Sequence, residues 1–196
     1  MKKLFLLLFF LTVFFACRET NQSGEKDKQN NNTNTTGNET ESALLLPKET
    51  IAKFHFSDST TEDIFKLVAD GFDPLRSNIT LTISNSKGEL LYSESFKSDQ
   101  LIDDKIFDMT QNPTEEDKKK YAVRKMKTFF ESNSFSQPAI PDEDEFTDEY
   151  SDRAIWDDIK SDKSAVGFYY LLGAVNGKSI AYSKKQKKVV VYFTCC

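Results

Sequence analysis

Ile79-Thr-Leu-Thr-Ile-Ser84, followed by Asn85-Ser-Lys-Gly88, is the stretch of sequence that decides the fold class of this chain. Ile79, Leu81 and Ile83 alternate with hydroxyl side chains, which predicts a strand with one face toward the core and one toward water. Asn85 to Gly88 has the composition of a turn, and residues 89–96 return the chain beside the first strand. The stretch therefore predicts an antiparallel β-hairpin.

Upstream of this hairpin, the sequence predicts one strand and one short helix. Residues 51–57 (IAKFHFS) alternate apolar and polar side chains, as a half-buried strand does. Thr60-x-x-Asp63 then resembles a capping box that opens a helix. Gly71 is expected to end this helix, and its buried stripe is expected to consist of Ile64, Phe65 and Val68.

Downstream of the hairpin, two further helices are predicted on either side of an acidic loop. The first begins after Asn112-Pro-Thr114 and runs to about residue 132, with acidic residues before basic ones, the order that the helix dipole favours. Its expected core stripe consists of Ala122, Met126, Phe129 and Phe130. The acidic loop 137–150 follows, and Ser151 is expected to cap a short helix that carries Ile155, Trp156 and Ile159.

The C-terminal part predicts a three-stranded meander made of residues 166–172, 178–183 and 188–194, with Asn176-Gly177 as its first hairpin turn. Both faces of 166–172 are apolar, so either both faces are covered or one face is a binding surface. With the N-terminal strand and the hairpin, the meander predicts an α+β fold with a mostly antiparallel sheet packed with two or three helices. We expect residues 44–196 to form a single globular domain.

The first residues have the pattern of an export signal. Lys2 and Lys3 precede an apolar run, Leu4 to Cys17, that is interrupted by Thr12. The run is shorter than the roughly 20 residues that a membrane-spanning helix needs. A positive start, a short apolar stretch and a small residue before the break indicate a signal peptide over residues 1–16.

The residues around the expected cleavage point favour lipoprotein processing. Ordinary signal peptidase prefers small side chains one and three residues before the cut, and Phe14 is bulky where a small residue is wanted. Ala16-Cys17 resembles instead the lipobox of bacterial lipoproteins, although Phe14 and Phe15 depart from its usual pattern. The resemblance implies that Cys17 is the lipid acceptor. It further implies anchoring to a bacterial membrane, with the outer membrane favoured, and a folded domain outside the cytoplasm.

Residues 17–43 are expected to be a disordered tether that begins with the lipid-acceptor cysteine. The segment is rich in Asn and Thr and has almost no aliphatic side chains, so it cannot bury enough apolar area to offset the entropy of ordering. As a flexible coil it would reach roughly 28 Å. We therefore expect a flexible link between the membrane and the folded domain.

Charge and cysteine content narrow the possible partners. The formal net charge is −5, and removal of Lys2 and Lys3 with the leader makes the mature chain more negative, which argues against nucleic-acid binding.

If Cys17 carries lipid, Cys195 and Cys196 are left as a possible disulfide between neighbours. An intermolecular bridge and free thiols remain the alternatives.

Few residues have the pattern of a catalytic or metal site. His55 is the single histidine, which excludes a multi-histidine zinc site and leaves His55 as the one possible base for a Ser-His-Asp or Cys-His arrangement. No cofactor is predicted. The acidic run contains four candidate calcium ligands, which could instead serve a hydrolase as its acid and base beside Trp156: Asp142, Asp144, Glu145 and Asp148.

These observations favour a lipid-anchored cell-envelope protein that acts as a non-catalytic binding module for an unknown protein or glycan. One alternative is a carboxylate-dependent hydrolase that acts on envelope glycans, with the acidic residues of 142–152 in the catalytic roles. Another alternative is an inhibitor of an enzyme, which the sequence does not distinguish from a binding module.

Overall fold

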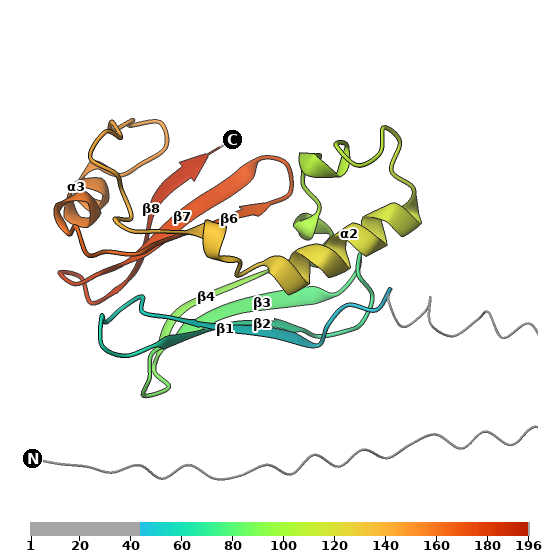
Figure 1. Cartoon of the computed structure of the whole chain (residues 1–196), viewed down its shortest axis with the longest axis horizontal. Helices are drawn as coiled ribbons and strands as arrows, with labels where there is room; N and C mark the ends of the chain where they lie inside the picture. Colours follow the sequence, from blue (N-terminus) through green and yellow to red (C-terminus); the bar gives the residue numbers. More distant parts are fainter. Residues whose placement is uncertain (1–43, 196) are drawn as a thin grey trace, which may run out of the picture. The chain divides into compact units, whose positions relative to one another are not determined.

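The computed structural model describes residues 44–195, which fold into two four-stranded antiparallel sheets and two α-helices (Figure 1). Sheet A contains, in spatial order, β1 (Glu49–Phe54), β2 (Asp63–Ala69), β3 (Asn78–Ser84) and β4 (Leu90–Lys97). Sheet B contains, in spatial order, β5 (Phe135–Ser136), β6 (Gly167–Leu172), β7 (Asn176–Ser183) and β8 (Lys188–Cys195). The α-helices are α2 (Glu115–Thr128) and α3 (Arg153–Ser161), and the short 3-10 helices are η1 (Ser98–Leu101), η2 (Asp104–Ile106) and η3 (Ser132–Ser134). The predicted α+β fold with antiparallel strands is confirmed.

The hairpin predicted from residues 79–96 is β3 and β4. The side chains of Ile79, Leu81 and Ile83 are fully buried, whereas the hydroxyl residues between them are partly exposed. Asn85 and Gly88 close the turn through a backbone hydrogen bond of 2.9 Å, and Gly88 has a φ of 82°, a conformation that glycine adopts without strain. The alternation and the turn chemistry together were sufficient to locate this element.

The helix predicted from Thr60 to Gly71 is wrong, because this segment contains strand β2. Phe65, Leu67 and Ala69 point into the core at every second position, which is strand periodicity rather than helical periodicity. Asp63 does not cap a helix. Its buried carboxylate accepts hydrogen bonds from the backbone of Phe56 and from the backbone and side chain of Ser57, and so fixes the connection from β1 to β2.

Two further local predictions were wrong. The turn between β6 and β7 lies at residues 173–175, where Gly173 has a φ of 66°, and Asn176-Gly177 already belongs to β7. Helix α3 is capped by Asp152, whose carboxylate accepts a hydrogen bond from the backbone N–H of Ile155, and not by Ser151. Helix α2 begins as predicted, with Thr114 as its N-cap in a reciprocal capping box with Asp117.

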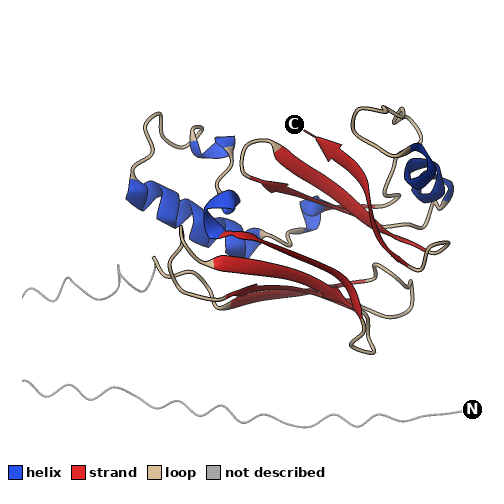
Figure 2. Ribbon diagram, turned by 180° about the vertical axis from the view of Figure 1, so that it is seen from behind, coloured by secondary structure: helices blue, strands red, loops and turns tan. Residues whose placement is uncertain are grey.

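The main core lies between the inner faces of the two sheets. Figures 1 and 2 show sheet B over one half of sheet A and α2 over the other half. A cluster of aromatic rings joins the two sheets, with the rings of Phe65 in β2 and Phe168 in β6 5.4 Å apart. A smaller core on the outer face of sheet B contains Trp156 and Ile159 of α3 packed against Ala181 and Val190. Both helices are therefore held by burial of one apolar face.

A polar network crosses the main core between the sheets. Glu94 of β4 accepts hydrogen bonds from Lys178 (2.5 Å), Tyr170 (2.5 Å) and Tyr92 (2.8 Å). Burial alone raises the pKa of the Glu94 carboxyl, but these hydrogen bonds outweigh burial and hold its pKa below the usual range. Burial also raises the pKa of Tyr92 to about 12, so both partners keep their ordinary charge states near neutral pH.

Candidate functional site

The largest open pocket near the predicted acidic residues is a groove of about 570 Å³ on the outer face of sheet B. Its floor is formed by β6, β7 and β8, and its walls by α3 and by the acidic loop 137–150. We call it the acid–aromatic groove, and it is lined by Ser136, Ala139, Pro141, Glu143, Asp144, Glu145, Trp156, Tyr169, Ser179, Tyr192 and Phe193.

The aromatic floor of the groove follows from the two apolar faces of β6. Phe168 and Tyr170 point into the main core, and Tyr169 between them points to the outer face and is 40% exposed. A Cβ atom on Gly177 would lie 2.8 Å from the Tyr169 hydroxyl, so glycine at this position lets the tyrosine ring lie across β7. The outer face is thus partly covered, by α3 and its loop, and partly exposed at Tyr169.

One wall of the groove is fixed by a buried tyrosine. The hydroxyl of Tyr192 donates a hydrogen bond of 2.9 Å to the carbonyl oxygen of Ala139, which ties the loop to β8. Burial raises the pKa of Tyr192, so its hydroxyl stays protonated and remains a donor. A Cβ atom on Gly167 would lie 2.5 Å from that hydroxyl and 3.1 Å from the Ala139 Cα, so this wall requires glycine in β6.

The rim of the groove carries negative charge that no cation in the described range neutralises. The side chains of Glu143, Asp144 and Glu145 are exposed, and none of them forms an ion pair with a residue between 44 and 195. Lys160 donates instead to the backbone carbonyls of Asp142 and Asp144, and Lys163 pairs with the carboxylate of Asp142. Lys160 thus holds the backbone of the loop and Lys163 holds the side chain of Asp142, while the carboxylates of Glu143, Asp144 and Glu145 face solvent.

The groove adjoins a second hollow, of about 430 Å³, on the far side of Phe193. Asp148 and Glu149 line this hollow and are exposed, like the acids of the groove rim. The Ser151 hydroxyl, also part of the lining, is buried and has no hydrogen-bond partner among residues 44–195. A buried polar atom without a partner is uncommon in native proteins and needs an explanation such as a ligand or an ordered water.

The structure does not gather the predicted calcium ligands at one point. Asp144 and Glu145 lie on the groove rim, Asp148 lines the adjoining hollow, and Asp142 is paired with Lys163. Within residues 44–195, no three His, Cys, Asp or Glu side chains are arranged to hold a metal ion. The geometry therefore lends no support to the calcium hypothesis.

The same carboxylates lack the environment that a glycosidase acid needs. A catalytic carboxylic acid is kept protonated by an apolar, water-excluding pocket. Asp144 and Glu145 are exposed, and the nearby Trp156 is only 5% exposed because it packs into the small core against Phe146. This arrangement suits contacts with a ligand better than proton transfer to it.

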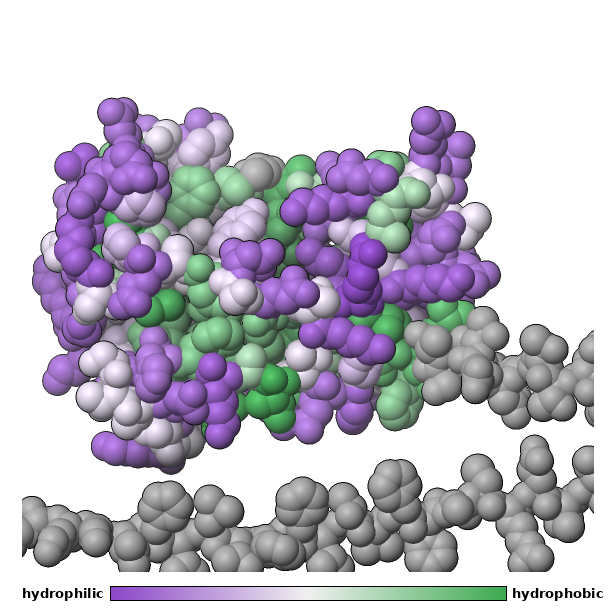
Figure 3. Space-filling view, viewed as in Figure 1, coloured by the Kyte–Doolittle hydropathy of each residue, from purple (hydrophilic) through white to green (hydrophobic). Residues whose placement is uncertain are grey.

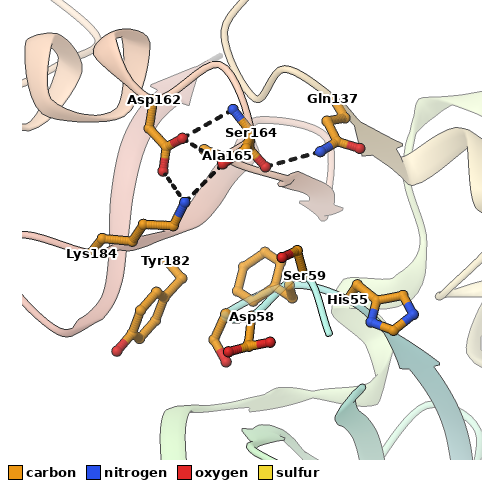
Figure 4. Close-up of a pocket in the computed structure, with 11 residues that line it drawn as sticks. His55, Asp58, Ser59, Gln137, Asp162, Ser164, Ala165, Tyr182 and Lys184 are labelled. Carbon is orange, nitrogen blue, oxygen red and sulfur yellow. Dashed lines mark hydrogen bonds and ion pairs between the residues drawn. The ribbon is translucent and has the colours of Figure 1, made fainter. Parts of the chain in front are cut away.

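His55 lies in a separate pocket of about 230 Å³ between the β1–β2 connection and the segment that follows α3. Figure 4 shows Asp162, Ser164 and Lys184 joined by hydrogen bonds on one side of this pocket, with His55 on the other. Ser164 donates to Asp162 at 2.6 Å, and the Lys184 ammonium lies 2.8 Å from both residues. Lys184 donates to both the serine hydroxyl and the carboxylate, so it is not placed to accept a proton from the serine.

No hydrogen bond within residues 44–195 joins His55 to a hydroxyl or a carboxylate, so the pocket lacks the base–nucleophile pair of a hydrolase. A hydrogen bond from the Thr60 side chain lowers the pKa of Asp58, which shapes the β1–β2 connection. We interpret this pocket as structural.

A fourth pocket, of about 420 Å³, lies between α2 and β6. Asp103 accepts hydrogen bonds there from Tyr121 and from Lys125, the latter at 2.9 Å. Burial alone raises the pKa of Asp103, but the hydrogen bonds from Tyr121 and Lys125 outweigh it and lower the pKa. Because these groups satisfy one another, they anchor α2 to the chain that precedes it.

The cysteines fall mainly outside the described part of the chain. The predicted lipid acceptor Cys17 and the last residue, Cys196, are not among residues 44–195. Cys195 ends β8, and its sulfur lies beside Gly177, where an added Cβ would approach it to 2.8 Å. The predicted disulfide between Cys195 and Cys196 stays a prediction.

No protein-family model, no curated protein and no solved structure matches this chain. Among the described residues, no helix is long and apolar enough to cross a membrane. Sequence reasoning found the acidic rim and Trp156 but missed Tyr169 and Phe193 as its aromatic floor. The two apolar faces of β6 were the available signal for Tyr169, and Gly177, which leaves room for the Tyr169 ring, was assigned to a turn.

Proposed function

We propose that this protein is a lipid-anchored binding module of a bacterial cell envelope and that the acid–aromatic groove is its binding site. The observation that carries the proposal is the combination of a partly exposed aromatic floor with a rim of carboxylates that have no cation partner in residues 44–195. An open site with fixed walls and exposed charges can bind a partner without any chemical step.

The chemistry of the groove favours a positively charged, extended segment of a partner protein. Carboxylates on the rim attract cations over long distances, and the face of Tyr169 or Phe193 stabilises a guanidinium or ammonium group placed above it. The acidic residues of the adjoining hollow extend the same charge beyond Phe193. A neutral glycan would use the aromatic floor but would gain little from so much unpaired negative charge.

The binding experiment compares defined probes on the full chain in detergent. The probes are a hexapeptide of alternating Arg and Tyr, a matched Glu-Tyr hexapeptide and a chitin hexasaccharide. The variant Glu143→Gln, Asp144→Asn, Glu145→Gln removes the rim charges with little change of shape and should weaken binding of the Arg-Tyr peptide about tenfold, measured by titration calorimetry. Tyr169→Ala keeps every charge and should weaken binding by a comparable factor.

The matched control is Glu62→Gln, Asp99→Asn, Asp108→Asn, which removes the same amount of exposed charge away from the groove. This control should bind the peptide nearly as well as the natural chain. Equal weakening by both triple variants would mean non-specific attraction and would contradict the proposal. If the chitin hexasaccharide binds, and its affinity depends on Tyr169 but not on the rim charges, the partner is a glycan rather than a protein.

The anchor is tested separately from the groove. Cells that express the full chain are fed an alkyne-bearing palmitate, and incorporation into the protein is measured after purification. Cys17→Ser should abolish the label, because the thiol that accepts the diacylglycerol is gone, whereas Cys195→Ser should keep it. An unlabelled natural chain, or a label that survives in Cys17→Ser, would show that the anchor prediction is wrong.

A further inference from the structure

Strand β1 is the edge of sheet A, and its hydrogen-bonding groups alternate between its two sides. The backbone N–H of Ala69 donates to the carbonyl of Lys48 at 3.0 Å, and Ala69 and Lys48 continue the β1–β2 register. Residues in an antiparallel pair bond to the partner strand at every second position. It follows that the N–H and C=O groups of Glu49, Ile51 and Lys53 point away from β2, and no strand within residues 44–195 pairs with them there.

The same three residues carry the side chains on the outer face of the edge. Ile51 at the centre is 50% exposed, and Glu49 and Lys53 flank it symmetrically with opposite charges. Ile64 of β2, which lies opposite Lys53 and diagonal to Ile51, is 37% exposed and extends the apolar patch. Figure 3 shows further apolar residues along the line between the two sheets, in a place distinct from the outer face of sheet A. Proline and β-bulges, which protect many edge strands, are absent from β1.

We propose that β1 pairs antiparallel with β1 of a second copy of this chain, with Ile51 opposite Ile51. In this register Glu49 of each copy lies opposite Lys53 of the other, so two opposite-charge pairs form on one face. In this register the residues whose backbone N–H and C=O groups point away from β2 lie opposite one another, as the hydrogen-bond pattern of an antiparallel strand pair requires. The two copies of sheet A would become one continuous sheet.

Other registers are less favourable. A one-residue shift would bring outward-pointing groups opposite inward-pointing ones and place the side chains on the wrong face. A two-residue shift would put Ile51 opposite a charged residue, and a four-residue shift would put Glu49 opposite Glu49 or Lys53 opposite Lys53. The existing ion pair of 2.7 Å between Glu49 and Lys66 of β2 does not prevent the pairing, because a carboxylate accepts from two cations.

The experiment uses full chains with two different affinity tags, co-expressed and purified from the same membranes. Glu49→Lys in both copies sets Lys opposite Lys, and Lys53→Glu in both copies sets Glu opposite Glu. Because like charges directly opposite each other destabilise a strand pair, each combination should lower recovery of the second tag about tenfold. Co-expression of one Glu49→Lys copy with one Lys53→Glu copy restores both charge pairs and should restore recovery.

The mixed combination also controls for folding, because both altered chains must fold for recovery to return. Lys87→Glu, in the exposed β3–β4 turn, is a charge reversal away from the edge and should leave recovery unchanged. Undiminished recovery in the two like-charge combinations would overturn the proposal. The proposal would also be overturned if the mixed combination failed to restore recovery of the second tag. The same holds if Lys87→Glu lowered that recovery as much as the like-charge combinations do. None of these outcomes depends on the acid–aromatic groove, which lies on sheet B.

Discussion

Replacing Phe65 with alanine should lower the free energy of unfolding by about 3–5 kcal/mol, the usual cost of removing a buried phenylalanine ring. Phe65 lies on β2 near the centre of sheet A and is fully buried. Its ring contacts five other phenylalanines, drawn from both sheets and from the chain after α2: Phe54, Phe56, Phe130, Phe135 and Phe168. The cavity left by the ring would therefore open where sheet A meets sheet B.

Urea unfolding followed by circular dichroism measures this change, and thermal unfolding should show a lower Tm by roughly 10 °C for a domain of this size. Phe72→Ala is the matched control, because the Phe72 side chain is 55% exposed and its loss should change stability by less than about 0.5 kcal/mol. A Phe65→Ala variant that unfolds with the midpoint of the natural protein would contradict the observed packing between the sheets.

The second large effect is expected for Glu94→Gln. The substitution leaves Lys178 near the core without its carboxylate partner and weakens the acceptor for Tyr170 and Tyr92. Loss of one partner of a largely buried pair should cost about 3 kcal/mol. Glu116→Gln, which breaks the exposed pair between Glu116 and Lys120 on α2, should cost about 0.5 kcal/mol or less.

The cost of Glu94→Gln should also depend on pH in a defined direction. The pKa of Glu94 is lower in the folded protein than in the unfolded chain, so its contribution is fully present above the ordinary carboxyl pKa. As the pH falls below that value toward the folded pKa, Glu94 becomes protonated and its contribution is lost. The stability difference between the natural protein and Glu94→Gln should therefore shrink in acid. A difference that grows below pH 4 would contradict the assigned network.

The elements that could be predicted are those whose local chemistry agrees with their place in the fold. The β3–β4 hairpin has strict alternation and a turn with glycine at the required position, and α2 has a capping box and a regular core stripe. Nothing outside these segments was needed to define them. The same agreement holds for the strands of the C-terminal meander, whose limits shift by only a few residues.

Strand β2 could not be predicted because its two patterns compete. Asp63-Ile-Phe-Lys-Leu-Val-Ala69 has apolar residues at both helical and strand spacing, and Thr60 and Asp63 mimic a capping box. Residues 63–69 form a strand rather than a helix because they pair with β1 on one side and with β3 on the other, and these are tertiary contacts. Asp63 accepts hydrogen bonds from the connection that precedes it in the sequence and does not cap a helix that follows it.

The candidate site was predictable in its charge but not in its shape. The acidic loop is evident from composition, yet the loop is held in place by Lys160, Lys163 and Tyr192, which lie outside it in the sequence. Gly177 was assigned to a turn because Asn-Gly is a frequent turn pair. In the fold it lies inside β7, under the ring of Tyr169, and that contact exists only once the sheet has formed.

The spatial order of strands in both sheets equals their order along the chain, and this has a consequence for how the protein reaches its fold. Every neighbouring pair except β5 and β6 closes a short loop, so most pairings within the sheets carry a low entropic cost and favour fast folding. During synthesis or export the N-terminal sheet would be complete before the C-terminal sheet emerges. Its apolar inner face would stay open to water, and to chaperones, until β6 and β7 arrive to cover it.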